Sequence, residues 1–187
     1  LLLKHSERIE LNTRTNFGST ALMMACEDGH KDVVKLLLDH SERIELNARS
    51  NNGNTAFMFA CYYGHKDVVK LLLDHSGSGD INFNAKNSVG STGFMLACKK
   101  GCKDVVQLLL DHSERIDLNA RDDNGKTAFM MVLHCACDSS KYPQLVKKIL
   151  QQPNIDINAK DENGDTALRL AVEHQNFEII QEIVNYG

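Results

Sequence analysis

Apolar residues occur in short blocks along the chain, and polar stretches rich in glycine, asparagine and serine separate the blocks. In one of the longer blocks the apolar residues Val68, Val69, Leu72 and Leu73 lie at positions i, i+1, i+4 and i+5. This spacing places them on one face of an α-helix, which we expect over residues 66–75.

A shorter apolar block precedes this helix and has its own start and stop signals. Thr55 stands where a helix N-cap belongs, because its hydroxyl can accept a backbone N–H that the first turn leaves free. Gly64 can adopt the left-handed conformation that ends many helices. A short helix is therefore expected between these two residues, after a turn at residues 51–53.

The unit of turn, short helix, tight loop and longer helix recurs along the chain. The segment GHKDVVKLLLDHS is identical at residues 29–41 and 64–76, and residues 101–113 differ from it at two positions. A G-x-T marker begins five units, and its glycines are 35, 37, 35 and 39 residues apart. Neither helix of a unit can bury its apolar face alone, so we expect neighbouring units to stack into one array.

This ordered pattern resembles the ankyrin repeat over residues 12–187. Residues 50–76 read SNNGNTAFMFACYYGHKDVVKLLLDHS, and an N-A-R or N-A-K signature recurs in the return segments. The resemblance implies an all-α fold, an ankyrin-type helix-turn-helix solenoid with short β-hairpin-like loops. It also implies a loop-bracing role for His30 and His65. Methionine replaces a family histidine at Met23, Met58, Met95 and Met130.

On this resemblance the 187 residues form a single ankyrin-repeat domain. The expected divisions are the remnant of a preceding repeat at 1–11, repeat 1 at 12–46, repeat 2 at 47–81, repeat 3 at 82–117, repeat 4 at 118–157 with an insertion at about 133–142, and repeat 5 at 158–187. Further repeats are expected in the parent chain.

Composition and charge exclude several classes of function. Apolar residues make up 42% and charged residues 25%, which is typical of a folded globular protein. The net charge is −4, so we expect no nucleic acid partner. No apolar run reaches the length of a transmembrane helix, so no membrane insertion is expected. The six cysteines have no disulfide-framework spacing, which favours an intracellular location, cytoplasmic or nuclear.

The sequence predicts no catalytic, cofactor-binding or metal-binding residues. It contains no G-x-S-x-G, P-loop or H-E-x-x-H motif. Cys26, Cys61 and Cys98 share a repeat position where a small buried residue is expected. Cys135 and Cys137 lie in the expected insertion, where an oxidisable thiol is a candidate.

The resemblance implies that the chain binds another protein or peptide, and we expect a monomer. In the family, partners contact the hairpin tips and the concave side of the first helices. The matching tip residues are Asn16, Phe17, Asn52, Asn54, Val89, Asn124 and Lys126. The matching helix-end residues are Glu27, Asp28, Tyr62, Tyr63, Lys99, Lys100 and His134.

Some of these residues are not the types that usually occupy helix ends and turn tips, which supports a functional role. Glu27 and Asp28 are anions at a helix C-terminus, where the helix dipole disfavours them. Phe17 and Val89 are apolar residues on turn tips, where asparagine or aspartate is usual. Along the stack, the helix-end positions run from acidic through aromatic to basic.

Asn158 is the best candidate in the chain for a modification known in the family, asparagine β-hydroxylation. The resemblance places leucine eight residues and aspartate two residues before the acceptor, and Leu150 and Asp156 match both positions. A purely structural asparagine is the alternative.

Other functions stay open on the sequence alone. The segment can be the regulatory or targeting arm of a larger enzyme or channel whose working domain lies elsewhere. It can also be an enzyme that uses the cysteine and histidine residues of the expected insertion. The near-identity of several repeats is compatible with an engineered or recently duplicated array.

Overall fold

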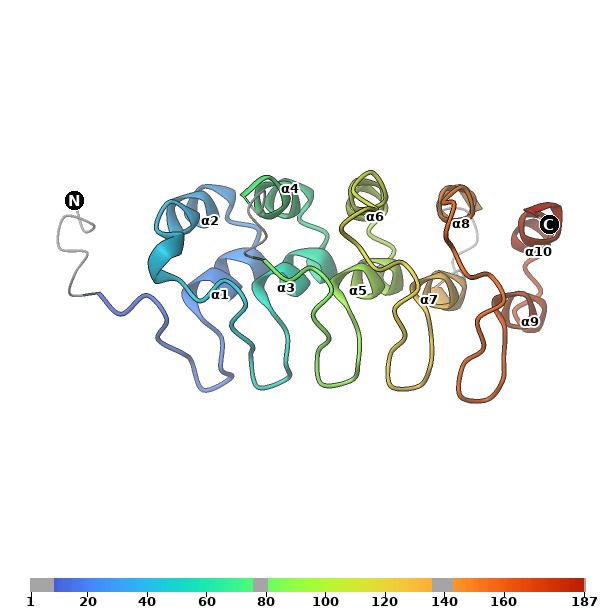
Figure 1. Ribbon diagram of the computed structural model, residues 1–187, viewed down its shortest axis with the longest axis horizontal. Coiled ribbons are helices and arrows are strands. Elements are labelled where there is room, and N and C mark those ends of the chain that lie inside the picture. Colours follow the sequence, from blue (N-terminus) through green and yellow to red (C-terminus); the bar gives the residue numbers. More distant parts are fainter. Residues whose placement is uncertain (1–8, 76–80, 136–142, 187) are drawn as a thin grey trace.

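The computed structural model describes residues 9–75, 81–135 and 143–186, and these residues form a stack of paired helices. Figure 1 shows the odd-numbered helices in one row and the even-numbered helices in a second row. The helices are α1 (Ala21–Glu27), α2 (Lys31–Leu38), α3 (Ala56–Tyr63), α4 (Lys66–His75), α5 (Gly93–Lys100), α6 (Lys103–Leu110), α7 (Ala128–Cys135), α8 (Pro143–Leu150), α9 (Ala167–Glu173) and α10 (Phe177–Tyr186), with a short 3-10 turn at Ser41–Arg43.

The helices of the odd-numbered row begin at threonine caps, as predicted. The Thr55 hydroxyl accepts a hydrogen bond from the backbone N–H of Met58 at 3.3 Å. The Met58 sulfur in turn accepts from the N–H of Thr55 at 3.5 Å, and Met95 and Thr92 repeat this exchange in α5. Methionine therefore closes the first turn at the position where the family motif has histidine.

Glycine ends two of these helices in the left-handed conformation. Gly64 has φ of 77° after α3, and Gly101 has φ of 67° after α5. A residue with a Cβ atom is disfavoured at such angles, so glycine allows the chain to reverse at once into the next helix. The predicted stop signal is confirmed.

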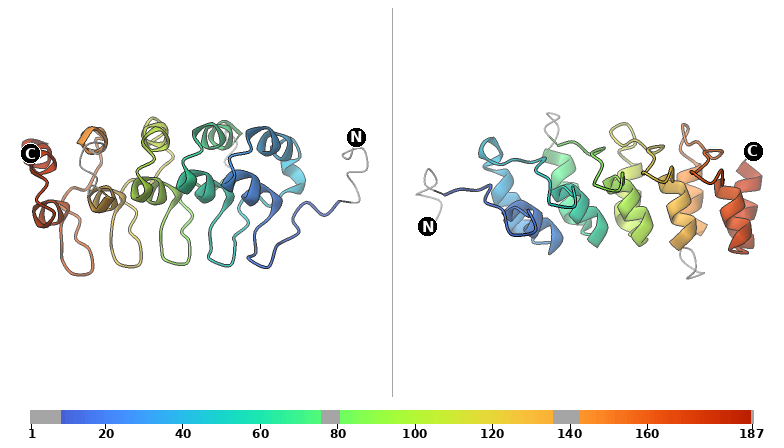
Figure 2. Two further views of the ribbon diagram at one scale, coloured as in Figure 1. Left: turned by 180° about the vertical axis from the view of Figure 1, so that it is seen from behind. Right: turned by 90° about the horizontal axis from the view of Figure 1, so that it is seen from below.

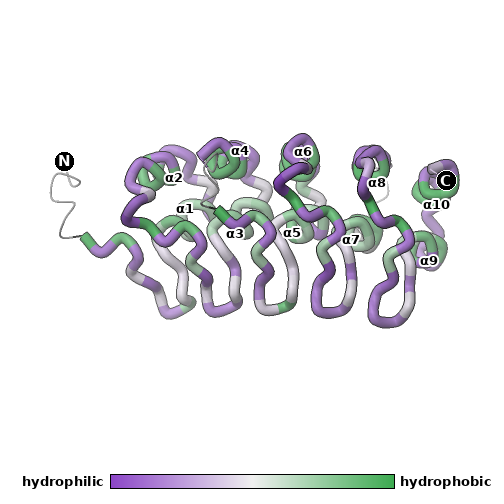
Figure 3. The backbone as a smooth tube through the Cα atoms, in the orientation of Figure 1, coloured by the Kyte–Doolittle hydropathy of each residue, from purple (hydrophilic) through white to green (hydrophobic). Residues whose placement is uncertain are grey.

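The core lies between the two helix rows and between successive pairs. The predicted apolar face of α4 is buried, with Val68, Val69, Leu72 and Leu73 all at most 2% exposed. The helices of each row pack side by side in chain order, and the views in Figure 2 agree. Figure 3 shows hydrophobic residues gathered on the helices and hydrophilic residues along the loops.

The loops project from the odd-numbered row and are linked to one another by backbone hydrogen bonds. The N–H of Asn51 donates to the carbonyl of Phe17 at 3.0 Å, and the N–H of Asp123 donates to that of Val89 at 3.2 Å. Within the described ranges, β pairing is limited to an isolated bridge between Arg121 and Thr127. The fold is therefore an all-α solenoid with hairpin-like loops, as predicted.

The expected insertion of repeat 4 lies partly inside a helix. Residues 133–135, the first three of the expected segment, form the end of α7. Cys137 and the rest of the segment up to residue 142 lie outside the described residues.

None of the helices in the described ranges combines the length and the apolar character that a bilayer crossing requires.

Candidate functional site

The predicted binding residues fall into two rows along one side of the stack. The tip row consists of Asn16, Phe17, Asn52, Asn54, Val89, Asn124 and Lys126. The helix-end row consists of Glu27, Asp28, Tyr62, Tyr63, Lys99 and Lys100. Two apolar members of the tip row are strongly exposed, Phe17 at 79% and Val89 at 57%. His134 belongs to α7, but its side chain lies outside the described part of the structure.

The acidic and aromatic members of the helix-end row are in direct contact. The Tyr63 hydroxyl donates a hydrogen bond to Glu27 Oε1 at 3.0 Å. This bond to a carboxylate raises the pKa of the Tyr63 phenol above its ordinary value, with smaller contributions from burial and the nearby negative charge. The Tyr63 ring stacks on His65, whose Nε2 donates to the Glu27 carbonyl at 2.8 Å. His65 thus braces the loop, as the resemblance implied.

The aromatic and basic members are also joined. The ring centroids of Tyr62 and Tyr63 are 5.0 Å apart in an edge-on arrangement. The Lys100 ammonium lies 4.6 Å from the centre of the Tyr62 ring, a cation–π geometry. The sequence of acidic, aromatic and basic positions is therefore one connected surface across three repeats, held together by contacts between repeats.

A third row was missed by sequence reasoning. The fourth residue after each cap threonine is apolar in all five repeats, and these residues form the row. We call them the floor row, and its members are Met24, Phe59, Leu96, Met131 and Leu170. Met24 is 47% exposed, whereas Leu96 and Met131 are 8% and 7% exposed. The signal was present in the sequence, because all five residues occupy one repeat position.

The structure brings three predicted residues together at a hollow of about 190 Å³ between α5, α7 and α9. Lys99, Asn124 and Lys126 line it. In the sequence these residues belong to two separate rows and two different repeats. The remaining lining residues were not predicted as binding residues, and they are Asp122, Met130, Met131 and Leu170.

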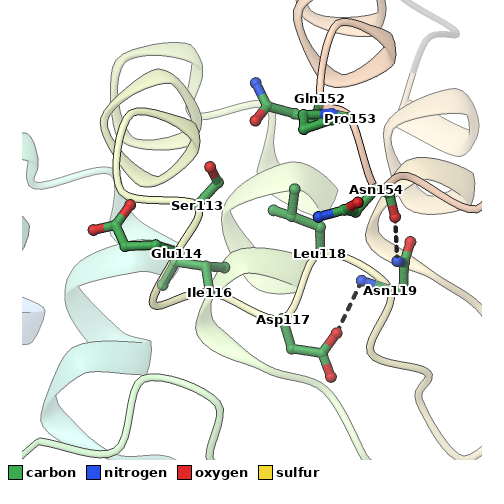
Figure 4. Close-up of a pocket in the computed structure, with 9 residues that line it drawn as sticks. All are labelled: Ser113, Glu114, Ile116, Asp117, Leu118, Asn119, Gln152, Pro153 and Asn154. Carbon is green, nitrogen blue, oxygen red and sulfur yellow. Dashed lines mark hydrogen bonds between the residues drawn. The ribbon is translucent and has the colours of Figure 1, made fainter.

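On the opposite edge, asparagine side chains connect successive return loops. Asn119 Nδ2 donates to the carbonyl of Asn154 at 2.6 Å, and the N–H of Asp156 donates to Asn119 Oδ1 at 2.8 Å. Both residues of the first of these bonds line a hollow of about 350 Å³ (Figure 4). Asn12 and Asn84 make the same kind of contact to the next return loop. These asparagines therefore link successive return loops, and this hollow belongs to the stacking of the loops.

Asn158 differs from the other asparagines of this column. It is exposed, and its side-chain amide has no hydrogen-bond partner among residues 9–75, 81–135 and 143–186. Its backbone N–H donates to the Asp156 carboxylate at 3.1 Å. Asn158 is therefore accessible to a modifying enzyme, which would oxidise the β-carbon of its side chain.

The three cysteines of the shared repeat position are buried, as predicted. Burial raises the pKa of Cys26 to about 12 and raises the pKa of Cys61 well above its ordinary value. Cys102 is only half-buried, and its thiol donates to the Tyr62 carbonyl at 3.7 Å. In the described part of the chain, histidines, cysteines and carboxylates nowhere form a group of three that could hold a metal ion.

The paired helices, linked loops and continuous exposed rows define a stacked helical-repeat protein, a class that offers an extended binding surface. The family model for ankyrin repeats, with three copies, matches residues 1–87 and 78–161, and the chain belongs to this family. Domains of this family are generally protein–protein interaction modules and are typically non-catalytic.

A solved structure agrees with this assignment. The crystal structure of the ankyrin repeat domain of Bcl-3, a unique member of the IkappaB protein family, is similar with a TM-score of 0.84 and 26% sequence identity. The match covers 100% of this chain and 77% of that chain. Comparison with curated protein sequences finds no match.

Proposed function

We propose that this chain is a non-catalytic adaptor or scaffold module that binds one protein or peptide partner as a monomer inside the cell. The proposed contact surface is the helix-end row together with the tip row. The connected acidic, aromatic and basic surface around Tyr62 and Tyr63 is the observation that carries the proposal. Tyrosine is enriched among residues that dominate binding energy at interfaces.

The contacts in this surface contribute little to the free energy of folding, which favours a role in recognition. The Tyr63–Glu27 bond lies at the surface, where such a bond contributes little to folding. Lys100 over Tyr62 is also exposed, and a cation–π contact there is worth about 0.5–1 kcal/mol. Two large rings held in a fixed arrangement nevertheless provide a rigid contact area for a partner.

The test is a pull-down from a relevant lysate with the intact chain and with Tyr62→Ala/Tyr63→Ala. We expect the double variant to weaken capture of the partner about tenfold or more. Tyr186→Ala is the matched control, because Tyr186 is an exposed tyrosine on α10, away from the helix-end row.

Thermal unfolding of both variants completes the test. The double variant should unfold close to the temperature of the unmodified chain, since neither ring belongs to the core. A double variant that binds normally, or one that unfolds, would refute the proposed surface.

The proposed intracellular location has support in the cysteines. In the described structure, Cys26, Cys61, Cys98 and Cys102 are not joined in disulfides. Free buried thiols are usual in reducing compartments, whereas secreted domains use cysteine for disulfides.

A second proposal concerns modification rather than binding, and the exposure of Asn158 favours it. We propose that Asn158 is an acceptor for asparagine β-hydroxylation. After incubation with such a hydroxylase, O2 and the reducing co-substrate of the enzyme, peptide mass spectrometry should find one oxygen inserted at the β-carbon of Asn158 and none on Asn119, whose amide is engaged between loops. Absence of the added oxygen at Asn158 would refute this proposal.

A further inference from the structure

We propose that the hollow between α5, α7 and α9 is an anchor pocket, which takes one apolar side chain of a partner peptide while Lys99 and Lys126 bind a carboxylate on the neighbouring residue. The inference rests on the proposed function and names the chemistry of the partner. It concerns a different part of the surface from the tyrosine pair.

The volume of the hollow indicates what kind of group can occupy it. Its volume is about 190 Å³, below the range of roughly 300–1,000 Å³ that is usual for small-molecule and cofactor sites. A hollow of this size suits a single side chain. Because it opens on the exposed side of the stack, between the tips and the helix ends, that side chain can belong to a peptide lying along the rows.

One side of the hollow has apolar walls. Met130 and Met131 of α7 are 1% and 7% exposed, and Leu170 of α9 closes the neighbouring side. Methionine is flexible and polarizable, so it adapts to apolar side chains of different shape. These walls favour leucine, isoleucine, methionine or phenylalanine over a polar side chain.

The polar groups at the hollow favour a negative neighbour. Lys99 is exposed and Lys126 half-buried, and each carries a positive charge. Asp122 also lines the hollow, but its Oδ1 accepts hydrogen bonds from the N–H groups of Asn124 at 3.0 Å and Lys126 at 2.8 Å. This oxygen is engaged within its own turn, and the lysines outnumber the single carboxylate.

The two lysine charges also disfavour a partner that carries a basic residue at this place. A basic residue next to the apolar anchor would face two like charges, and such juxtaposition lowers affinity. The partner segment that fits is therefore a peptide with an apolar residue beside aspartate or glutamate. A neutral apolar peptide would lack the attraction to the lysines, and an acidic peptide without an anchor would leave the hollow unfilled.

The test begins with selection of random 12-residue peptides displayed against the intact chain. We expect the enriched peptides to share an apolar residue adjacent to aspartate or glutamate. The selected peptide is then titrated into protein whose methionine methyl groups carry ¹³C. The Met131 methyl signal should shift, whereas that of Met24, the floor-row methionine at the other end of the stack, should stay in place.

The second part of the test measures peptide binding by charge-reversal variants. Lys99→Glu/Lys126→Glu should weaken binding of the selected peptide about tenfold or more. Lys103→Glu is the matched control and should leave affinity unchanged, because Lys103 is an exposed lysine at the start of α6 and does not line the hollow. These surface changes leave the apolar core intact.

The outcomes separate the two proposals. The anchor pocket is overturned if the enriched peptides lack the acidic residue. It is also overturned if they shift the methyl signal of Met24 and leave that of Met131 unchanged. The proposed binding function survives in both cases. Equal affinity for a single-stranded oligonucleotide with the same Met131 shift also overturns the peptide assignment. Failure to enrich any peptide overturns both proposals.

Discussion

Helices α2 and α4 have the same sequence in different surroundings. Both lie in the segment GHKDVVKLLLDHS, at residues 29–41 and 64–76. Val68 of α4 is 1% exposed, whereas its counterpart Val33 of α2 is 45% exposed. The difference cannot come from the residues themselves, since they are identical.

Neighbouring helices explain the difference. Helix α4 packs between α2 and α6, whereas among the described residues only α4 flanks α2 within the even-numbered row. The helix forms in both places, because its caps and its periodicity are local. Burial of its first valine depends on a neighbour that stands about one repeat away, which is the general behaviour of stacked repeats.

Leucine-to-alanine substitution at equivalent positions should give the largest contrast. Leu72 is 1% exposed, and Leu72→Ala should lower the free energy of unfolding by roughly 2–5 kcal/mol through a core cavity. Leu37 is only partly buried, so Leu37→Ala should cost roughly 1 kcal/mol. Urea denaturation followed by circular dichroism measures both. Equal losses would show that the surroundings of the two helices do not differ as described.

Valine-to-threonine substitution probes the same contrast with almost no change in volume. Val68→Thr buries a hydroxyl and should cost about 1–3 kcal/mol of stability. Val33→Thr leaves the hydroxyl in contact with water and should stay within about 0.5 kcal/mol of the unmodified chain. Thermal unfolding of the pair decides the matter, and a large loss at Val33 would contradict its exposure.

Gly93 and Ala56 occupy one repeat position in α5 and α3, and no pattern in the sequence explains the glycine. A Cβ atom at Gly93 would lie 2.7 Å from Cε1 of Phe57, a ring that is 1% exposed. Gly93→Ala should therefore lower stability by about 1 kcal/mol, although alanine is the better helix former by a similar amount. Unfolding by guanidinium measures the change, and a gain in stability would mean that the ring moves aside freely.

The smallest expected effect is a difference in the rate at which a buried and a half-buried cysteine thiol are labelled. Burial raises the pKa of Cys26 to about 12, so its reactive thiolate is scarce at pH 8 and increases only as the pH rises further. Burial also raises the pKa of Cys102, but this thiol is half-buried and Lys100 opposes the shift. Iodoacetamide followed by peptide mass spectrometry should find Cys102 modified before Cys26 and Cys61. Faster labelling of Cys26 would show that repeat 1 opens readily.

The candidate site was predictable in part. Lys99, Asn124 and Lys126 followed from their repeat positions, and Phe17 and Val89 from apolar character on turn tips. Met131 and Leu170 were missed because each resembles a core residue in its own helix. That they line one hollow depends on how α7 and α9 stack beside α5, which no pattern within a single helix reports.

The sequence by itself determined the helix pairs, their caps, the glycine stops and the order of the repeats, because these signals act over a few neighbouring residues. Only the tertiary structure decided how deeply identical helices are buried, how Tyr63 meets Glu27, and where the hollow beside Lys126 lies. Each of these features depends on contacts between residues that are about one repeat or more apart in the sequence. The distances between such residues depend on how successive helix pairs pack.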